Sequence, residues 1–208
     1  MASFHAMVWW QYGLWNLAGF VGAVVVNSFV EWAVHRWVMH TRNPLVPYGY
    51  LHTTSHHATF GADATYEALN EGMLDHGVAF TWREFVLFPL FCAAIYVPVE
   101  IVLRRPVLLG CMAAVYAGLA AFNFLHYRFH VPAWRRIDRR LAWVERTGMF
   151  RFLNRHHLLH HERMDRNLNV VVPLADLCFG TLSSDDMSPQ LPSADLANEA
   201  LRNTKPAG

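Results

Sequence analysis

FVLFPLFCAAIYVPVEIVL, residues 85–103, and VLLGCMAAVYAGLAAFNFL, residues 107–125, are two long apolar runs separated only by Arg104-Arg105-Pro106. Glu100 is the one charged residue within them. Each run is long enough to cross the hydrocarbon core of a bilayer, about 30 Å thick, because an α-helix rises about 1.5 Å per residue. The two runs therefore predict a transmembrane hairpin with a tight turn.

A third run, residues 7–30, contains no Lys, Arg, Asp or Glu and predicts the first span. The alternative is a set of fully buried helices in a soluble protein, but a chain of 208 residues would leave too little polar protein to cover them. The composition, 54% hydrophobic and 16% charged, also favours a membrane protein. We expect an all-α integral membrane bundle of about three to four spans, formed by residues 1–184. Residues 185–208, rich in Ser, Pro, Asn and Ala, are expected to form a flexible tail.

The arginines are distributed asymmetrically and predict the orientation in the membrane. With three spans, Arg104 and Arg105 lie on one side and most other arginines lie on the opposite side, which the positive-inside rule assigns to the cytoplasm. Residues 133–154 combine apolar positions at helical spacing with arginines on other faces. They predict one amphipathic helix at the membrane surface, or a solvated basic helix packed on protein. The arginines on the presumed cytoplasmic side are Arg36, Arg42, Arg83, Arg128, Arg135, Arg136, Arg139, Arg140 and Arg146.

Histidine clustering is the most informative feature of the sequence. Of thirteen histidines, all but His5 and His76 lie in four short segments that adjoin the predicted spans or their connections. Imidazole is a ligand for divalent first-row metals, and helical residues three or four apart can hold one ion between them. Because one ion rarely takes more than six ligands, this number of histidines predicts two ions in one site. The segments are His35/His40, His52/His56/His57, His126/His130 and His156/His157/His160/His161.

The spacing also predicts which histidines share an ion. His126/His130, His52/His56, His156/His160 and the set His157/His160/His161 satisfy the helical rule. His35 and His40 are five residues apart, about 140° on an ideal α-helix. They are therefore expected either to serve different metals or to have a helix end between them.

The order H-x4-H, H-x3-HH, H-x3-H, H-x2-HH, interleaved with apolar spans, resembles the fatty acid hydroxylase / sterol desaturase superfamily. The segment from Asn169 to Thr181, NVVVPLADLCFGT, resembles the stretch after the last histidine box of that superfamily, and the likeness extends from about Glu31 to Leu182. The resemblance implies a helical membrane fold with a cytosolic cap, a dimetal centre, and hydroxylation or desaturation of a lipid. The ligands it implies are His35, His40, His52, His56, His57, His126, His130, His157, His160 and His161.

Several further residues are expected near this site. Glu31 and Asn169, and also Asp165, are expected to orient ligand imidazoles, with a capping or surface role as the alternative. His156, the additional member of its box, is expected behind the ligands or on the substrate side. His76 fits none of the boxes and is a weaker candidate for the site.

The reaction that the resemblance implies needs a redox metal and O2, since an aliphatic C–H bond is inert to acids, bases and nucleophiles. Nitrogen ligands are compatible with a pair of iron ions, and zinc binds the same ligands. The expected substrate is a fatty acyl chain or related lipid from the bilayer, with Trp32, Trp37, Phe80, Trp82 and Phe124 as candidate walls. The alternatives are a carotenoid ring hydroxylase, a lipid or sterol desaturase, and, in another class, a membrane metal-binding or transport protein without redox chemistry.

The electrons are expected to come from a separate ferredoxin, cytochrome or reductase. The sequence has no G-x-G-x-x-G dinucleotide fingerprint after a strand, and its three cysteines form no C-x-x-C pair. Cys92, Cys111 and Cys178 are instead expected to be buried, inert thiols. Membrane lipids are the other expected partners, and no nucleic acid is expected.

Overall fold

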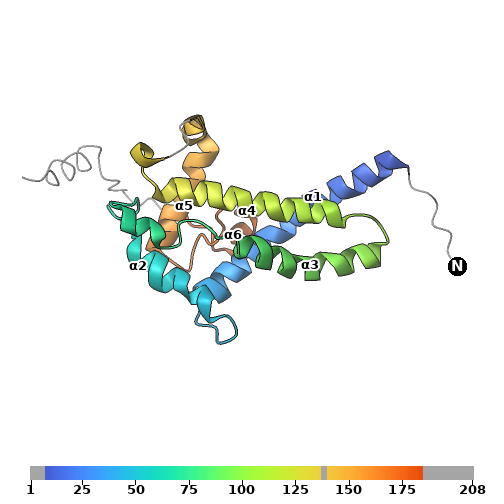
Figure 1. Cartoon of the computed structure of the whole chain (residues 1–208), viewed down its shortest axis with the longest axis horizontal. Helices are drawn as coiled ribbons and strands as arrows, with labels where there is room; N and C mark the ends of the chain where they lie inside the picture. Colours follow the sequence, from blue (N-terminus) through green and yellow to red (C-terminus); the bar gives the residue numbers. More distant parts are fainter. Residues whose placement is uncertain (1–7, 137–139, 185–208) are drawn as a thin grey trace, which may run out of the picture.

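The computed structural model describes residues 8–136 and 140–184, and the regular structure within these ranges is entirely helical. Three long helices, α1 (Trp9–Val34), α3 (Glu84–Leu103) and α4 (Leu108–His130), extend toward one end of the molecule (Figure 1). All three are long and apolar enough to cross a membrane. The all-helical integral membrane fold that the sequence predicts is confirmed, with three candidate spans.

The outer surfaces of these helices carry large apolar side chains. Leu87 and Ile101 of α3 and Leu109 of α4 are all more than 60% exposed. Such exposure is unfavourable in water and favourable in lipid, where only the backbone needs internal hydrogen bonds and the helix supplies them. The bundle therefore presents a surface suited to acyl chains.

The spans continue directly into the histidine segments. Within the described residues α1 begins at Trp9, and after Val34 it passes into the π-helical turn η1 (His35–Met39), well beyond the predicted end at residue 30. Similarly, α4 continues past the predicted end at Leu125 to His130. The membrane helices themselves thus hold the histidines of the first and third segments.

A tight turn joins α3 to α4, as the sequence predicts. Arg104 adopts a left-handed conformation with φ of 50°. One carboxylate oxygen of Glu100 accepts hydrogen bonds from the backbone N–H groups of Val107 (2.9 Å) and Leu108 (2.6 Å). These donors at the start of α4 have no partner within the helix, so Glu100 explains how the hairpin closes.

Glycines allow α1 and α4 to cross closely. A Cβ atom at Gly110 would lie 1.8 Å from the carbonyl oxygen of Asn16, and one at Gly19 would lie 2.5 Å from that of Val107. The Gly110 N–H donates to the side chain of Asn16 at 2.8 Å. Small residues that permit such close backbone approach are typical of helix packing in membranes.

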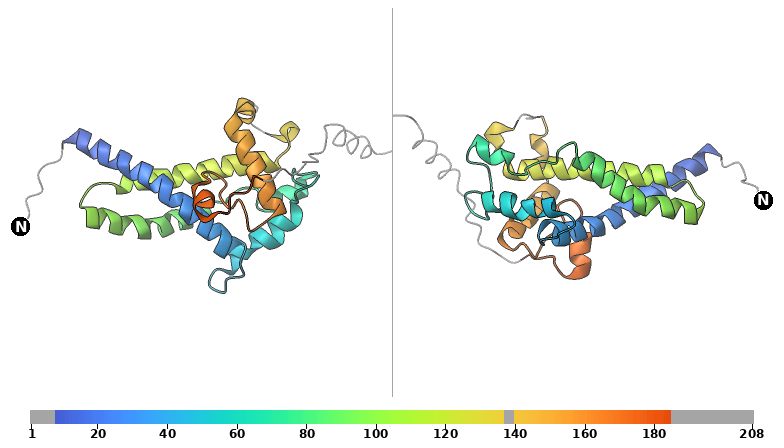
Figure 2. Two further views of the ribbon diagram at one scale, coloured as in Figure 1. Left: turned by 180° about the vertical axis from the view of Figure 1, so that it is seen from behind. Right: turned by 60° about the horizontal axis from the view of Figure 1, so that its bottom comes forward.

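Short helices form a cap at the other end of the spans (Figures 1 and 2). Long connections between them cross the ends of α1 and α4 and bring the chain back repeatedly to the same region. The helices of the cap are η2 (Pro47–Tyr50), η3 (His52–His56), α2 (His57–Thr59), η4 (Glu71–Asp75), η5 (Ala133–Arg135), η6 (Ala142–Arg146), α5 (Gly148–Glu162) and α6 (Leu174–Phe179).

The single amphipathic helix expected over residues 133–154 is wrong. The described part of this segment holds the 3-10 turns η5 and η6, and α5 begins only at Gly148, where the Thr147 hydroxyl accepts the N–H of Phe150. Glu145 forms ion pairs with the buried Arg128 and with Arg136. The pair with Arg128 holds η6 against the end of α4.

Two of the three cysteines are buried. Cys92 and Cys111 are buried among the spans, as expected, but Cys178 on α6 is exposed, so the expectation of a buried thiol is wrong there. The predicted tail, residues 185–208, and the arginine at position 139 lie outside the described residues.

Candidate metal centre

Four chain segments bring ten histidines together at the cap end of the spans. They are η1 after α1, η3 with α2, the last turns of α4, and α5. Nine of the ten form two groups, and within each group the ligand nitrogens lie within 4.8 Å of one another. The first group is His35, His40, His52, His57 and His160, and the second is His56, His126, His130 and His157.

Histidines five residues apart share a group because the chain is π-helical there. The His40 N–H donates to the His35 carbonyl at 3.0 Å, and the His57 N–H donates to the His52 carbonyl. This i→i+5 bond widens the turn, so that residues five apart project to the same side. The rings of His35 and His40 stack with centroids 4.8 Å apart. η1 ends at Met39, so a helix end lies between the two histidines, which is one of the two expected alternatives, and both rings nevertheless lie in the first group.

The pairing of histidines three or four apart is partly different from the expectation. His126 and His130 lie in one group, as their spacing on α4 predicts. Other pairs are divided, because the two groups are adjacent and one helical segment can reach both. The divided pairs are His52/His56 and His157/His160.

Backbone carbonyls fix the tautomer of most of these rings. A carbonyl oxygen only accepts hydrogen bonds, so an Nδ1 atom that contacts one must carry the proton and Nε2 must keep its lone pair. Six histidines make such a contact, over 2.5–3.0 Å. The pairs are His35 with Leu168, His56 with His76, His126 with Val78, His130 with Tyr66, His160 with Arg166, and His161 with Phe60.

His40 is oriented by a side chain instead. The Thr53 hydroxyl donates to the Met39 carbonyl at 2.9 Å, so its oxygen accepts the Nδ1 proton of His40 at 2.9 Å. Nε2 of His40 therefore also keeps its lone pair. Partners of this kind are usual behind metal-binding histidines, where they fix the ring and raise its basicity.

The inward-facing nitrogens fit a cation. Nε2 of His40 lies 3.1 Å from Nε2 of His160, and the tautomers above leave both as acceptors with no proton between them. Nε2 of His56 and Nε2 of His126 are buried without a hydrogen-bond partner among the described residues. Facing lone pairs repel one another, and buried unpaired acceptors are unfavourable, unless a cation lies between them.

His161, the tenth expected ligand, lies between the two groups. Its Nε2 is 3.1 Å from Nε2 of His157 in the second group. Its ring centroid is 4.3 Å from that of His57 in the first group. It belongs to neither group, and its place as a ligand stays a prediction.

Burial keeps these imidazoles neutral. It lowers the pKa of His40 from 6.5 to about 4, and it lowers the pKa of His161, where the His126 and His40 charges add a smaller effect, to about 3. The pKa values of His157 and His160 are shifted in the same direction, first by burial and then by neighbouring histidines. Neutral rings with free lone pairs are the form that binds a metal.

The side chains of Glu31 and Asn169 bond to one another and to the backbone of Ser28 and Val170, not to a histidine ring. Glu31 accepts the Val170 N–H at 2.7 Å and lies 3.3 Å from the side-chain nitrogen of Asn169, which also donates to the Ser28 carbonyl. They tie α1 to the segment that carries Leu168, whose carbonyl orients His35. Their effect on the ligands is therefore indirect.

Three other candidates also lie outside both groups. The His76 ring contacts Ser55, and it is the His76 carbonyl that orients His56. The Nε2 of His156 lies 3.2 Å from a carboxylate oxygen of Asp176 rather than beside His160. Asp165 is exposed and lies near Arg166 at the surface.

Asp176 has a structural role that the sequence did not reveal. Its carboxylate accepts hydrogen bonds from the Leu168 and Asn169 N–H groups and from Thr181, in addition to its contact with His156. Burial alone would raise its pKa, but the bonds from His156, Thr181 and the backbone outweigh burial and lower it. Asp176 therefore holds the Leu168 segment against His35. A carboxylate within the apolar sequence VVVPLAD was the available signal.

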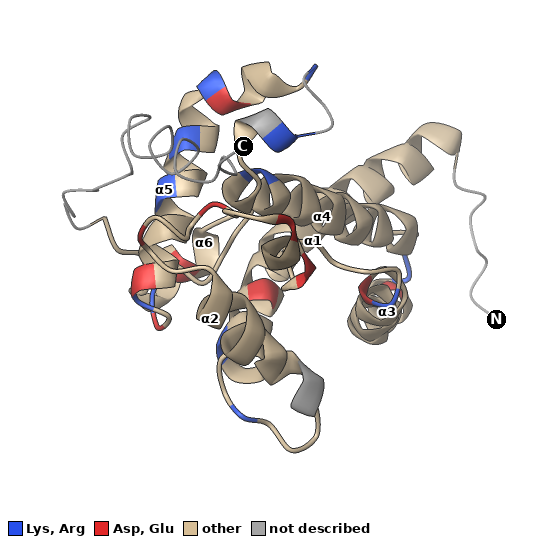
Figure 3. Ribbon diagram, turned by 60° about the vertical axis from the view of Figure 1, so that its left-hand side comes forward, with Lys and Arg blue, Asp and Glu red and all other residues tan. Residues whose placement is uncertain are grey.

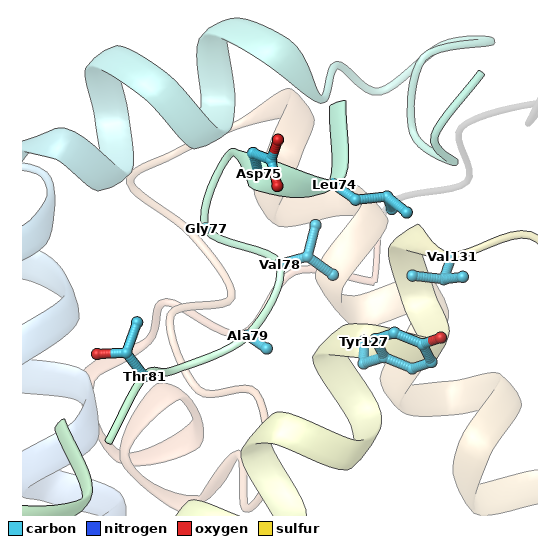
Figure 4. A pocket seen from close by; sticks show the side chains of 8 residues that line it. All are labelled: Leu74, Asp75, Gly77, Val78, Ala79, Thr81, Tyr127 and Val131. Carbon is cyan, nitrogen blue, oxygen red and sulfur yellow. The ribbon is translucent and has the colours of Figure 1, made fainter. Parts of the chain in front are cut away.

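A cavity of about 360 Å³ lies beside residues 76–78, the segment whose carbonyls at positions 76 and 78 orient His56 and His126 of the second group. Val78 from this segment and Tyr127 from α4 are on its two sides (Figure 4). The carbonyl of Val78 binds His126, so this segment separates the cavity from the second group. The lining is completed by Leu74, Asp75, Gly77, Ala79, Thr81 and Val131.

Comparison with known proteins agrees with this geometry. Residues 20–181 match the family model described as fatty acid hydroxylase, and this range contains both histidine groups. No curated protein and no solved structure matches the chain. The match covers most of the sequence, and the family is one of oxidoreductases. The chain therefore belongs to the fatty acid hydroxylase family.

Proposed function

We propose that this protein uses two metal ions and O2 to hydroxylate a C–H bond of a lipid, a fatty acyl chain or a related molecule. The observation that carries the proposal is the pair of adjacent groups of inward-facing imidazole nitrogens at the end of a membrane-spanning bundle. The proposed ligands are the ten histidines expected from the sequence, with His161 between the groups.

Two ions, proposed to be iron, would supply the activation of O2 that oxidation of an aliphatic C–H bond needs. The chain supplies orientation through the six carbonyls and Thr53. It also limits access of water. All four histidines of the second group are buried, whereas His40 and His57 of the first group are partly exposed. Solvent therefore reaches the first group more readily than the second.

A lipid substrate is supported by the continuity of α4 from the membrane into the site. Phe80 stacks on Phe122 at 4.4 Å, and Phe122 stacks on His126 at 5.1 Å. This aromatic column links the expected wall residue Phe80 with the second group. Trp37 and Trp82 are mostly exposed, so of the expected walls Phe80 has the best support.

The location of the histidines argues against a transport protein. A transport path would place ligands near the middle of the bilayer between spans. Here the histidines lie at the ends of α1 and α4 and in the cap. We propose that the cap faces the cytoplasm, because the arginines are concentrated there, apart from those at the α3–α4 turn (Figure 3).

Mass spectrometry of lipids from cells with and without the protein tests the proposed reaction. Hydroxylation adds one oxygen atom to a lipid, whereas desaturation removes two hydrogens, and modified carotenoids would show a carotenoid ring substrate. The purified, iron-loaded protein should be inactive with a reduced nicotinamide alone and active once a ferredoxin or cytochrome with its reductase is added. An unchanged lipid profile in cells that supply iron and such a donor would contradict the proposal.

A further inference from the structure

An exposed surface that combines apolar and basic side chains lies on η6 and the first half of α5. Trp143 is 62% exposed and Met149 is 71% exposed. Phe152, Arg146 and Arg151 beside them are also exposed. We call these five residues the Trp143 face. Neither histidine group uses any of them.

The helix geometry separates the apolar and basic parts of this face. On α5, Phe150 and Leu153 point into the core. At about 100° per residue, Met149 and Phe152 lie on one flank of the outer surface and Arg151 lies on the other. In η6, Trp143 and Arg146 are three residues apart and project to the same side, because a 3-10 helix has about three residues per turn.

Contacts with α4 place this segment at the boundary of the bilayer. Phe150 and Leu153 pack in one cluster with Phe122, Leu125 and Phe129 of α4, and the rings of Phe129 and Phe150 are 5.4 Å apart. The apolar run of α4 ends at Leu125 and is about 27 Å long, close to the thickness of the hydrocarbon core. The first half of α5 is therefore level with the end of that core. It runs across the spans rather than along them (Figures 1 and 2).

We propose that the Trp143 face rests in the headgroup layer of the same bilayer that the spans cross, and that it prefers anionic lipid. Tryptophan is enriched at this depth because its ring is apolar and its N–H is polar. Arg146 and Arg151 contact lipid phosphates, and Met149 and Phe152 reach the acyl boundary. The cap is thereby held flat against the membrane at a fixed height.

An acidic electron carrier is the competing occupant of a basic surface. The first half of α5 packs on α4 at the level where the hydrocarbon core ends, and this position favours lipid. A soluble carrier would have to displace headgroups to reach Met149 and Phe152. Trp143 and Met149 also expose a large apolar area. A docking site for a carrier would leave this area in water whenever no carrier is bound, whereas the acyl boundary covers it permanently.

Lipid quenching of a site-specific fluorophore tests the proposal in the full-length, metal-loaded protein. The background is Cys178→Ser, since Cys92 and Cys111 are buried. One variant carries Met149→Cys labelled with NBD, and the matched control carries Ala64→Cys with the same label. Ala64 lies in an exposed turn of the cap. The backbone that follows it is bonded to His130, beyond the end of the α4 apolar run.

Both proteins are placed in nanodiscs of phosphatidylcholine, with or without phosphatidylglycerol, that contain a lipid with a doxyl quencher near the headgroup. The probe at position 149 should be quenched several-fold more than the probe at position 64, and more strongly with phosphatidylglycerol. Arg146→Gln with Arg151→Gln should remove the effect of the anionic lipid.

Equal quenching at the two positions would overturn the proposal. A probe at position 149 that is unquenched by lipid and shielded only when an acidic ferredoxin is added would also overturn it and assign the face to a protein partner. Absence of a phosphatidylglycerol effect in the parent protein would overturn the preference for anionic lipid, and retention of the effect in the double arginine variant would overturn its assignment to Arg146 and Arg151.

Discussion

At the scale of single residues, the hydrogen-bond partner of each Nδ1 atom decides whether Nε2 of the same ring is free to bind a metal. Backbone carbonyls accept hydrogen bonds from the Nδ1–H groups of six rings, and the Thr53 hydroxyl oxygen accepts one from Nδ1–H of His40. This arrangement directs Nε2 toward the interior with its lone pair available. Substitution of a proposed ligand, His160, and of an orienting side chain, Thr53, tests this arrangement.

His160→Ala should remove bound metal and activity while the protein still inserts into membranes. Loss of a partner behind a ligand reduces metal affinity or activity by about 10–100-fold, so loss of the ligand itself should exceed that. His76→Ala is the matched control, because the His76 ring contacts Ser55 and its carbonyl is kept. Metal analysis and the lipid assay give the readout. Equal metal content in the two variants would exclude His160 as a ligand.

Thr53→Val should weaken metal binding at the first group by about 10–100-fold, because valine cannot accept the Nδ1 proton of His40. Thr53→Ser keeps the hydroxyl and should restore most of the affinity. Titration of the metal-free protein with Zn²⁺ measures both. If the valine and serine variants bind Zn²⁺ equally, Thr53 does not orient His40.

The sequence predicted ten histidines as ligands from clustering that is visible in one dimension, and nine of them lie together in two groups. It did not predict Thr53 or Asp176 as supporting residues. Their roles depend on which rotamer and which carbonyl lies nearby. Glu31 and Asn169 were expected to orient ligand imidazoles, but their side chains bond to each other and to the segment that follows Leu168 rather than to a ring. The contacts of Glu31 and Asn169 could not be predicted, because they join residues more than a hundred positions apart.

At the scale of elements, helix type and helix crossing determine the site. The spans were predictable because lipid requires long apolar helices. The π-helical turns at His35 and His52 were not, since an α-helical period was assumed, although two H-x4-H spacings in neighbouring segments were the available signal. The fold of residues 133–154 was also missed, because the ion pair of Glu145 with Arg128 joins this segment to α4 and is not visible in its own periodicity.

Gly110→Ala should destabilise the bundle, since its Cβ would lie 1.8 Å from the backbone oxygen of Asn16. Overpacking of this kind costs about 1–3 kcal/mol. Gly118→Ala on the same helix is the matched control, because nothing lies within 4 Å of its Cβ position. Thermal unfolding in one detergent compares them. A Gly110→Ala protein as stable as the Gly118→Ala protein would show that α1 and α4 do not cross as described.

At the scale of the whole molecule, neutral buried histidines make the cap sensitive to acid. In the unfolded chain His40 and His161 titrate near 6.5, whereas in the folded protein burial lowers their pKa values to about 4 and about 3. Below pH 6.5 the unfolded state therefore binds more protons than the folded state. The stability that these rings contribute is complete above that pH and is lost as the pH falls through the folded values.

The metal-free protein should accordingly show a falling Tm as the pH drops from neutral to about 4. His40→Asn, which lacks one titrating ring, should lose less Tm over the same range than the parent protein. Unfolding followed by circular dichroism at a series of pH values measures both. A Tm independent of pH would contradict the neutral, buried state of the rings.

One helix contributes to both histidine groups, since His157 and His160 are less than one turn apart on α5. A rotation of α5 that improved the fit of one ion would carry a ligand of the other ion with it. The segment formed by η3 and α2 is also shared, because His52 and His57 lie in the first group and His56 in the second, so the separation between the two groups depends on both segments. An ion bound in one group would fix α5 and thereby position a histidine of the other group. A protein given less metal than the two groups can hold should therefore consist of fully loaded and metal-free molecules, with few that carry a single ion.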